Sequence, residues 1–359
     1  MQFGLCVATK IDDWQLIKYA EELGYDRAWV PDSQMIWSDC YATLALAAHN
    51  TSRIHIGTGV AIPGTRLAPV TAHSIASINR LAPGRVFLGM GTGHTAMRVM
   101  GMGPVKIRDF REYLRVVSTL LRGEEVDYTH NGETRDIRFL HLDLGFINIT
   151  NPIPIYVAGN NPRVLRAAGE FGNGLVFFGD PPETLQENHL HIAHEGAQKT
   201  GRPFPTNFHV ATFNTAVVLK AGESASSERV IDECGSMVAC IIHYVYEIYK
   251  QTQSEAVIPP FLKNIWDEYC AYVKNMKTPP EKRYQQIHNG HCTFLMPEER
   301  RFMTPEAVKG ACLVGEPDEL IAYVRRAEKA GLKELTLLPP MASARKVIKD
   351  FAEQVMTRY

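Results

Sequence analysis

The chain has 359 residues, of which 45% are hydrophobic and 21% are charged, a composition typical of a globular protein that can bury a sizeable core. Its 38 basic and 39 acidic residues nearly cancel, and no long basic stretch occurs, which argues against nucleic acid or an anionic membrane as a partner. No apolar run approaches the roughly 20 residues of a membrane span. A strand begins directly after Met1, so we expect no signal peptide and a cytoplasmic protein.

Strands and helices alternate along the first half of the chain. The apolar pattern predicts strands at residues 3–8, 27–30, 53–57, 86–90, 153–158 and 174–178, with further strands within 208–219 and 335–338. It predicts helices at residues 13–23, 41–49, 68–81, 105–122 and 161–171, and a hairpin over 123–140. This regular alternation favours a parallel sheet.

The segment 53–94 is the most informative part of this pattern. Two of its strands run into glycine-rich turns, and the helix over 68–81 lies between them, which makes a parallel β–α–β crossover. Both turns lie at the carboxyl ends of their strands, where ligands bind in barrels and open sheets alike. The chain offers close to eight strands and lacks Gly-x-Gly-x-x-Gly at its first helix, so we predict an α/β fold of the (β/α)8 TIM-barrel type.

Residues 223–305 interrupt the alternation with a tyrosine-rich, mostly helical stretch. Because strand and helix alternate again afterwards, we predict a single domain over residues 1–359. In this prediction the segment 223–305 is a helical insertion over the active-site end of the barrel.

The cysteines and histidines give little sign of a metal. The seven cysteines are scattered without a Cys-x-x-Cys pair, which indicates neither a zinc knuckle nor a disulfide framework and fits a reducing compartment. His288 and His291 are three residues apart, but no carboxylate or cysteine is spaced with them as in a metal motif. We therefore predict no metal site and expect these two histidines at most to line a substrate pocket.

Several short motifs occur in a characteristic order and spacing. They are Ala28-Trp29-Val30-Pro31-Asp32, Gly57-Thr58-Gly59-Val60, Gly84-Arg85-Val86-Phe87-Leu88-Gly89-Met90-Gly91-Thr92-Gly93, Ile155-Tyr156-Val157-Ala158-Gly159-Asn160-Asn161-Pro162-Arg163, and Val314-Gly315-Glu316-Pro317-Asp318-Glu319-Leu320 followed by Ala330-Gly331-Leu332. Together they resemble the bacterial luciferase-like superfamily of flavin- and deazaflavin-dependent oxidoreductases. The resemblance covers roughly residues 1–215 and 305–359, and it implies an enzyme with a (β/α)8 barrel that binds a flavin-type ring at its carboxyl edge.

The resemblance also assigns cofactor-binding residues. They are Asp32, Gly59, Val60, Gly91, Thr92, Gly93, Ala158, Gly159, Asn160, Asn161, Phe178 and Gly179. The ring is expected against the Gly59–Val60 peptide bond, which is usually cis in this family, whereas a glycine that merely ends a strand is the alternative. The phosphate is expected at residues 158–162, because main-chain N–H groups at a helix start bind anions without a lysine. The alternative there is an ordinary helix N-cap by Asn160 or Asn161.

Asp32 and His94 are the candidate catalytic residues. Asp32 follows the second strand, where a carboxylate can orient the ring or take up a proton. His94 follows the turn Gly91-Thr92-Gly93, whose glycines would let a ligand approach. The alternative is a structural or exposed histidine, of which a chain with 13 histidines offers many.

Three departures bear on the cofactor. Deazaflavin-using sugar-phosphate dehydrogenases of this family carry a histidine, a glutamate and a phosphate-binding lysine where this chain has Ser33, His94 and Pro181. The pair Gly59-Val60, in contrast, is typical of deazaflavin-dependent reductases. Because the three departures weigh against the sugar-phosphate dehydrogenases, we predict reduced FMN as the cofactor. The deazaflavin coenzyme is the alternative.

The function expected from this choice is a two-component monooxygenase that inserts one oxygen atom from O2 into a small organic substrate, such as a heterocycle. A separate flavin reductase would supply the reduced FMN, and the family analogy suggests a homo-oligomer. One alternative is a deazaflavin-dependent reductase or dehydrogenase that transfers hydride. Another is a barrel that binds flavin without catalysis.

Overall fold

The computed structural model describes residues 1–179 and 182–359, and it contains a closed barrel of eight strands in the order β1-β12-β9-β8-β7-β4-β3-β2. The barrel strands are β1 (Gln2–Cys6), β2 (Arg27–Val30), β3 (His55–Ala61), β4 (Val86–Met90), β7 (Ile155–Ala158), β8 (Gly174–Phe178), β9 (His209–Asn214) and β12 (Glu334–Leu337). The pairs from β1 through β2, β3, β4, β7 and β8 to β9 are all parallel. The prediction of an α/β fold of the (β/α)8 TIM-barrel type is confirmed.

The helices are α1 (Gln15–Glu22), α2 (Cys40–Asn50), α3 (Ala68–Leu81), α4 (His94–Arg98), α5 (Ile107–Leu121), α6 (Pro162–Phe171), α7 (His191–Lys199), α8 (Glu228–Thr252), α9 (Lys263–Lys274), α10 (Arg283–Ile287), α11 (Pro305–Ala311), α12 (Pro317–Lys329) and α13 (Ala344–Gln354). Short helical turns at Ile11–Asp13, Leu142–Leu144, Pro182–Thr184, Gln186–Leu190, Glu255–Val257, Pro260–Leu262, Pro280–Lys282, Pro297–Phe302 and Met356–Arg358 complete the set. Within the described residues, no helix has the length and apolarity that a membrane crossing requires.

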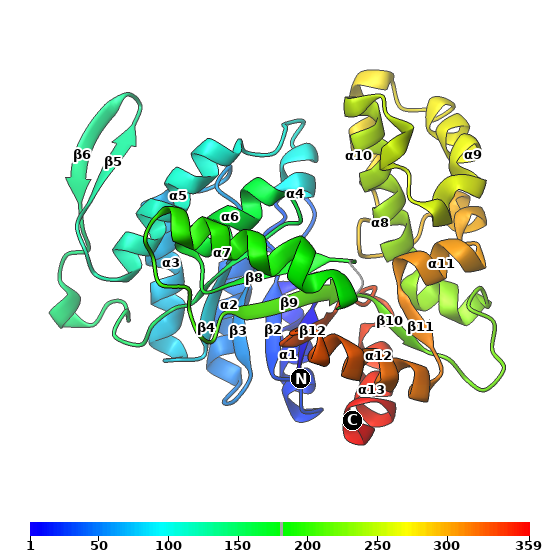
Figure 1. Cartoon of the computed structure of the whole chain (residues 1–359), viewed down its shortest axis with the longest axis horizontal. Coiled ribbons are helices and arrows are strands. Elements are labelled where there is room, and N and C mark those ends of the chain that lie inside the picture. Colours follow the sequence, from blue (N-terminus) through cyan, green and yellow to red (C-terminus); the bar gives the residue numbers. More distant parts are fainter. Residues whose placement is uncertain (180–181) are drawn as a thin grey trace. The chain divides into compact units, whose positions relative to one another are not determined.

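Two small sheets lie outside the barrel. The antiparallel hairpin of β5 (Val126–His130) and β6 (Glu133–Ile137) confirms the predicted hairpin and projects away from the barrel (Figure 1). The predicted strand within 208–219 is two strands, because the chain leaves the barrel after β9. Its continuation, β10 (Ala216–Val218), pairs in parallel with β11 (Leu313–Gly315).

Side-chain caps start several of these helices where the sequence places a short polar residue. The side chain of Asn161 accepts the N–H of Arg163 at the start of α6, and Pro162 occupies the first helical position. Asp39 caps α2 in the same way, and Ser227 caps α8. These residues set the points at which loops become helices, and therefore the shape of the loops at the strand ends.

Aromatic rings fill the middle of the barrel. Trp29 of β2 is fully buried, and its ring centroid lies 4.4 Å from that of Phe87 on β4 and 5.2 Å from that of Phe213 on β9. Tyr156 of β7 adds a further ring, 5.4 Å from Phe87. Because side chains occupy the interior, the barrel is a packed core whose ligand sites must lie at its ends.

The chain divides into two compact units, one of residues 1–213 and 326–336 and one of residues 214–325 and 337–359. The sequence predicted one domain with an insertion at 223–305, whereas the second unit takes in that segment together with α11, α13, most of α12 and the small β10–β11 sheet. Its predicted helical character is confirmed, because α8, α9 and α10 run through it (Figure 1). The expectation that the insertion covers the active-site end stays a prediction.

Candidate functional site at the carboxyl ends of the strands

The edge formed by β3 and β4 contains the glycines that the sequence singled out. The peptide bond between Gly59 and Val60 is cis, as the resemblance implied. A Cβ atom on Gly59 would lie 2.6 Å from the Cβ of Trp29, and one on Gly91 would lie 2.9 Å from Cγ2 of Val60. Packing within the protein therefore already requires both glycines. The Val60 side chain lies over the glycine backbone of β4 and the turn that follows it.

The turn after β4 leads directly into α4. Gly93 adopts a left-handed conformation with φ of 81° and precedes His94, the first residue of the helix. A side chain on Gly93 would also meet Met97 and Ile62. Gly91 lies next to Ala158 of β7 as well, since a Cβ on Gly91 would lie 3.5 Å from the alanine Cβ. Val60, Gly91 and Ala158, predicted separately as cofactor-binding residues, are thus neighbours at one edge of the barrel.

Asp32 is buried beyond β2 and is bonded to Arg66, Gln34 and the thiol of Cys40. Its Oδ2 lies 2.6 Å from Nη1 of Arg66, and Gln34 donates its amide N–H to Oδ1. The same guanidinium reaches Asp39 at 2.7 Å and lies over the ring of Tyr41. The carboxylate therefore belongs to a fixed ion-pair network.

Arg66 is the central residue of this network, and the sequence analysis missed it. It lies in the irregular loop after β3, where no periodicity marks it. Burial lowers its pKa, but the hydrogen bond and the charge of Asp32 raise it more, so the net shift is upward and the guanidinium stays charged. Tyr113 of α5 donates its hydroxyl to the Arg66 carbonyl at 2.9 Å, which anchors the loop. The turn Pro63-Gly64-Thr65, directly before Arg66 and beyond β3, was the available signal.

His94 is half-buried at the start of α4. Its Nε2 lies 3.2 Å from Nε of Arg98, one helical turn later. A guanidinium only donates, so Nε2 accepts and the ring proton resides on Nδ1. The two predicted catalytic residues therefore have different partners: Asp32 is held by Arg66, and His94 by Arg98.

The loops after β7 and β8 form the second part of the site. Asn160 donates its amide N–H to the Phe178 carbonyl at 3.0 Å and accepts the Phe178 N–H at 3.4 Å, so it joins the two loops. Gly159 and Gly179 both have positive φ, and a Cβ on Gly179 would meet nothing within 4 Å. Asn161 caps α6, which was the alternative weighed for it; Asn160 does not cap the helix.

This pair of loops presents main-chain donors to the exterior. In the described part of the chain, the N–H groups of Asn160, Asn161 and Gly179 have no hydrogen-bond acceptor, while that of Gly159 binds the Val176 carbonyl. The Phe178 side chain is 51% exposed beside them. Pro181, which replaces the lysine of the sugar-phosphate dehydrogenases, lies outside the described residues.

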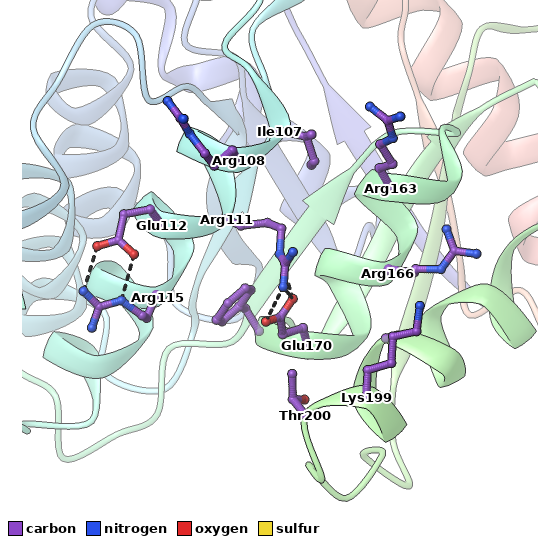
Figure 2. Close-up of a pocket in the computed structure, with 12 residues that line it drawn as sticks. Ile107, Arg108, Arg111, Glu112, Arg115, Arg163, Arg166, Glu170, Lys199 and Thr200 are labelled. Atoms are coloured by element: carbon purple, nitrogen blue, oxygen red, sulfur yellow. Dashed lines mark hydrogen bonds and ion pairs between the residues drawn. The ribbon is translucent and has the colours of Figure 1, made fainter.

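A wide groove lies on the outer helices instead of at the strand ends. It has a volume of about 660 Å³ and is lined by α5, α6 and α7. Two of its cations are neutralised by neighbours: Arg111 binds Glu170 with two hydrogen bonds, and Arg115 binds Glu112 in the same way (Figure 2). The glycine turns do not contribute to this groove, so we place the candidate site at the barrel edge.

The sequence of this chain is similar to a known family and to known enzymes. A family model described as luciferase-like monooxygenase matches residues 12–334. The 5,10-methylenetetrahydromethanopterin reductase of Methanolobus tindarius is 34% identical over 212 residues, which cover 58% of this chain and 62% of that protein. The F420-dependent glucose-6-phosphate dehydrogenase of Kineococcus radiotolerans is 34% identical over 198 residues, which cover 51% and 57%. The chain thus matches less than two thirds of the length of these two relatives.

Solved structures with the same fold include enzymes of both cofactor types. The coenzyme F420 dependent tetrahydromethanopterin reductase from Methanopyrus kandleri has a TM-score of 0.69 at 20% identity, with 100% of this chain and 99% of that chain covered. The oxygenating constituent of 3,6-diketocamphane monooxygenase from Pseudomonas putida, in complex with FMN, has a TM-score of 0.65 at 16% identity, with 100% and 99% covered. At these identities the likeness concerns the fold.

Proposed function

The chain belongs to the luciferase-like monooxygenase family, and from this we propose that it is an oxidoreductase that uses the deazaflavin F420 to transfer hydride to or from a small organic substrate. The observation that carries the cofactor is the 34% identity to a relative named as F420-dependent. The sequence alone favoured reduced FMN, and we now give preference to its alternative. Distant FMN proteins share the fold only, at 16% identity.

The donors of the second loop pair fit a phosphate-bearing cofactor. The main-chain N–H groups of Asn160, Asn161 and Gly179 lack acceptors in the described residues, and they lie by the N-terminus of α6, where the helix dipole favours an anion. We propose that they hold the phosphate, and that Asn160 keeps the two loops at a fixed spacing by its two hydrogen bonds to Phe178. A bound phosphate would give these donors the acceptors that the described residues do not supply.

We propose that the ring lies against Val60, beside Gly91 and Ala158, within the edge where these three residues meet. When bound there, the deazaflavin would supply a hydride donor or acceptor, and the protein supplies position and proton management. Asp32, fixed by Arg66 and Gln34, would orient the polar edge of the ring. Its immobility suits positioning better than proton shuttling.

His94 is our candidate for the proton that accompanies hydride transfer. Arg98 donates to Nε2, so in this tautomer His94 is neutral with its proton on Nδ1. To act as the acid, the ring would first take up a second proton at Nε2, which releases Arg98, and the imidazolium would then donate a proton and return to the neutral form. The His94→Ala variant should lower turnover about 100-fold, within the usual range for loss of a general acid or base. An unchanged rate and pH profile would assign His94 a structural role.

Anaerobic titration tests the proposal directly. The purified protein is mixed with F420 and, separately, with FMN, each oxidised and reduced, and binding is followed by cofactor fluorescence. We expect F420 to bind and its reduced form to resist oxidation by O2. Glucose 6-phosphate and methylenetetrahydromethanopterin are then tested as hydride partners. Tight binding of reduced FMN alone, followed by rapid oxygen consumption, would overturn the proposal in favour of the monooxygenase hypothesis.

A further inference from the structure

Three sulfur and nitrogen side chains meet inside the second unit, within residues 214–325. Cys240 lies on α8, and His291 and Cys292 lie in the turn after α10. The Sγ of Cys240 is 3.1 Å from Nδ1 of His291 and 3.5 Å from Sγ of Cys292. One nitrogen or sulfur atom of each residue lies within 4.8 Å of the other two. Among the described residues, no second group of His, Cys, Asp or Glu is arranged in this way.

The turn after α10 produces this arrangement. Gly290 and Cys292 both have positive φ, 78° and 49°, and His291 lies between them. A cysteine rarely adopts this left-handed conformation, since most side chains avoid that region. The main-chain N–H of Cys292 also donates to Sγ of Cys240 at 3.1 Å. Two adjacent side chains are thereby directed toward one sulfur whose residue is 51 and 52 positions away in the chain.

We propose that Cys240, His291 and Cys292 bind a divalent ion of the zinc class through two sulfurs and one imidazole nitrogen. Zinc takes thiolate and imidazole ligands at about 2.3 and 2.0 Å in a tetrahedron, whose edges are then about 3.5–3.8 Å. The 3.5 Å between the sulfurs is close to such an edge, and small side-chain rotations would bring the other distances to it. Thiolate donors disfavour magnesium and calcium, which bind oxygen.

A disulfide between the two sulfurs would explain only part of this geometry. It would need an oxidant, it would shorten the distance between the sulfurs to about 2.05 Å, and it would give His291 no role. A metal ion uses all three side chains. With three protein ligands, the fourth position would belong to water or a small ligand, as in open zinc sites.

The cluster lies in a buried part of the second unit. Burial, and then Cys292, raise the pKa of the Cys240 thiol well above its ordinary value, although His291 opposes the shift. Nearby, the buried His288 binds Glu247 at 2.9 Å, and the buried His243 binds Glu299 at 2.8 Å.

The experiment is a zinc titration of the full-length chain, free of histidine tags and kept reduced under argon. A chromophoric chelator competes for Zn²⁺, and elemental analysis after desalting gives the stoichiometry. We expect one zinc per chain. Replacement by Co²⁺ should give the intense sulfur-to-metal absorption of thiolate ligands, and this readout on the unaltered protein needs no variant to fold.

Variants then identify the ligands. Cys240→Ser, Cys292→Ser and His291→Asn should each weaken zinc binding by more than the roughly 10–100-fold caused by loss of a partner behind a ligand. Cys270→Ser, at a half-buried cysteine of α9, should bind as the unaltered chain does. Absence of stoichiometric zinc from the reduced protein would overturn the proposal, as would ligand-cysteine variants that bind zinc as tightly as the unaltered chain. A cobalt complex without the thiolate absorption would do so as well.

Discussion

The polar groups around Glu334, at the amino end of the barrel, and those of the loops after β7 and β8, at the carboxyl end, differ in their partners. At the amino ends of the strands, Glu334 of β12 is fully buried and accepts from Trp29 and His209 at 2.7 Å each, while Arg27 lies 3.2 Å away. Each of these three partners comes from β2 or β9. At the carboxyl ends, the loops after β7 and β8 leave main-chain N–H groups exposed, without acceptors among the described residues.

The buried network around Glu334 contributes to the stability of the fold, whereas the open N–H groups can contribute to binding a ligand. A buried charge must be compensated by the protein itself, and the network around Glu334 does so with four side chains when Thr336, at 2.6 Å, is included. Donors that the protein leaves open are available to a ligand. In barrels of this type the amino end commonly carries stability and the carboxyl end carries function. Here the carboxyl end combines the two, because it contains the open donors together with the buried Asp32–Arg66 ion pair.

Removal of Glu334 should have the largest effect. Glu334→Ala would leave Arg27 and His209 buried without their carboxylate, and loss of one partner of a buried ion pair costs about 3–5 kcal/mol. Urea unfolding followed by circular dichroism measures the change. The control is Glu112→Ala, which removes an exposed ion pair with Arg115 and should cost at most about 1 kcal/mol. Equal losses in the two variants would mean that the buried network around Glu334 contributes no more to stability than an exposed ion pair.

The same carboxylate should make stability depend on acid. Burial raises the pKa of Glu334, but the hydrogen bond and charge of His209, with the charge of Arg27, lower it more, so its pKa in the folded chain lies below the ordinary glutamate range. The stability that it contributes is therefore complete above the ordinary glutamate pKa and is lost as the pH falls through the lowered value. Unfolding free energies measured from neutral to acidic pH should show this slope in the unaltered chain.

Glu334→Gln tests the origin of that slope. Glutamine keeps the size of the side chain but does not take up a proton as the pH falls. The variant should therefore be less stable at neutral pH, and its stability should depend less on pH. An unchanged slope in the variant would mean that other carboxylates cause the acid sensitivity.

Replacement of Arg66 should have the next largest effect on stability, because its guanidinium compensates the charge of the buried Asp32 carboxylate at the carboxyl end. Arg66→Met keeps an unbranched apolar side chain but removes the guanidinium, which lies over Tyr41 and binds the carboxylate. The carboxylate then keeps Gln34 and the Cys40 thiol as partners. We expect a loss of about 1.5–3 kcal/mol in unfolding free energy, the range for hydrogen bonds to charged groups. The double variant Asp32→Asn, Arg66→Met should recover part of the loss. If it does not, the ion pair does not explain the cost.

The sequence predicted the barrel well because strand patterns are local. The strand at 86–90 matches β4 residue for residue, whereas β3 begins and ends later than predicted, since its glycines at 57 and 59 resemble a turn but continue the strand. The glycine turns and the Asn160–Asn161 loop were predicted by motif order. Their proposed roles as cofactor ligands stay predictions.

What the sequence did not reveal depends on contacts between distant residues. Glu334 looks like a polar residue in front of a strand, and only β2 and β9 make its burial possible. Arg66 lies in a loop without periodicity. Cys240 and His291 are 51 positions apart, so no spacing motif could join them.

Asn160→Ala should have the smallest effect on stability. It is also the most direct test of the loops at the carboxyl end. The variant removes the two hydrogen bonds between the loops after β7 and β8, so the open N–H groups would lose their fixed spacing. We expect cofactor affinity to fall about 10-fold, equivalent to about 1.4 kcal/mol. Stability should change by less than about 1 kcal/mol, because Asn160 is exposed. Fluorescence titration measures the cofactor affinity, and urea unfolding measures the stability.

The control is Asn50→Ala, at the exposed end of α2, which removes a hydrogen bond to Leu46 and should leave cofactor affinity unchanged. If Asn160→Ala instead lost stability and kept its affinity, the loops would be structural, and the contrast between the two ends of the barrel would fail.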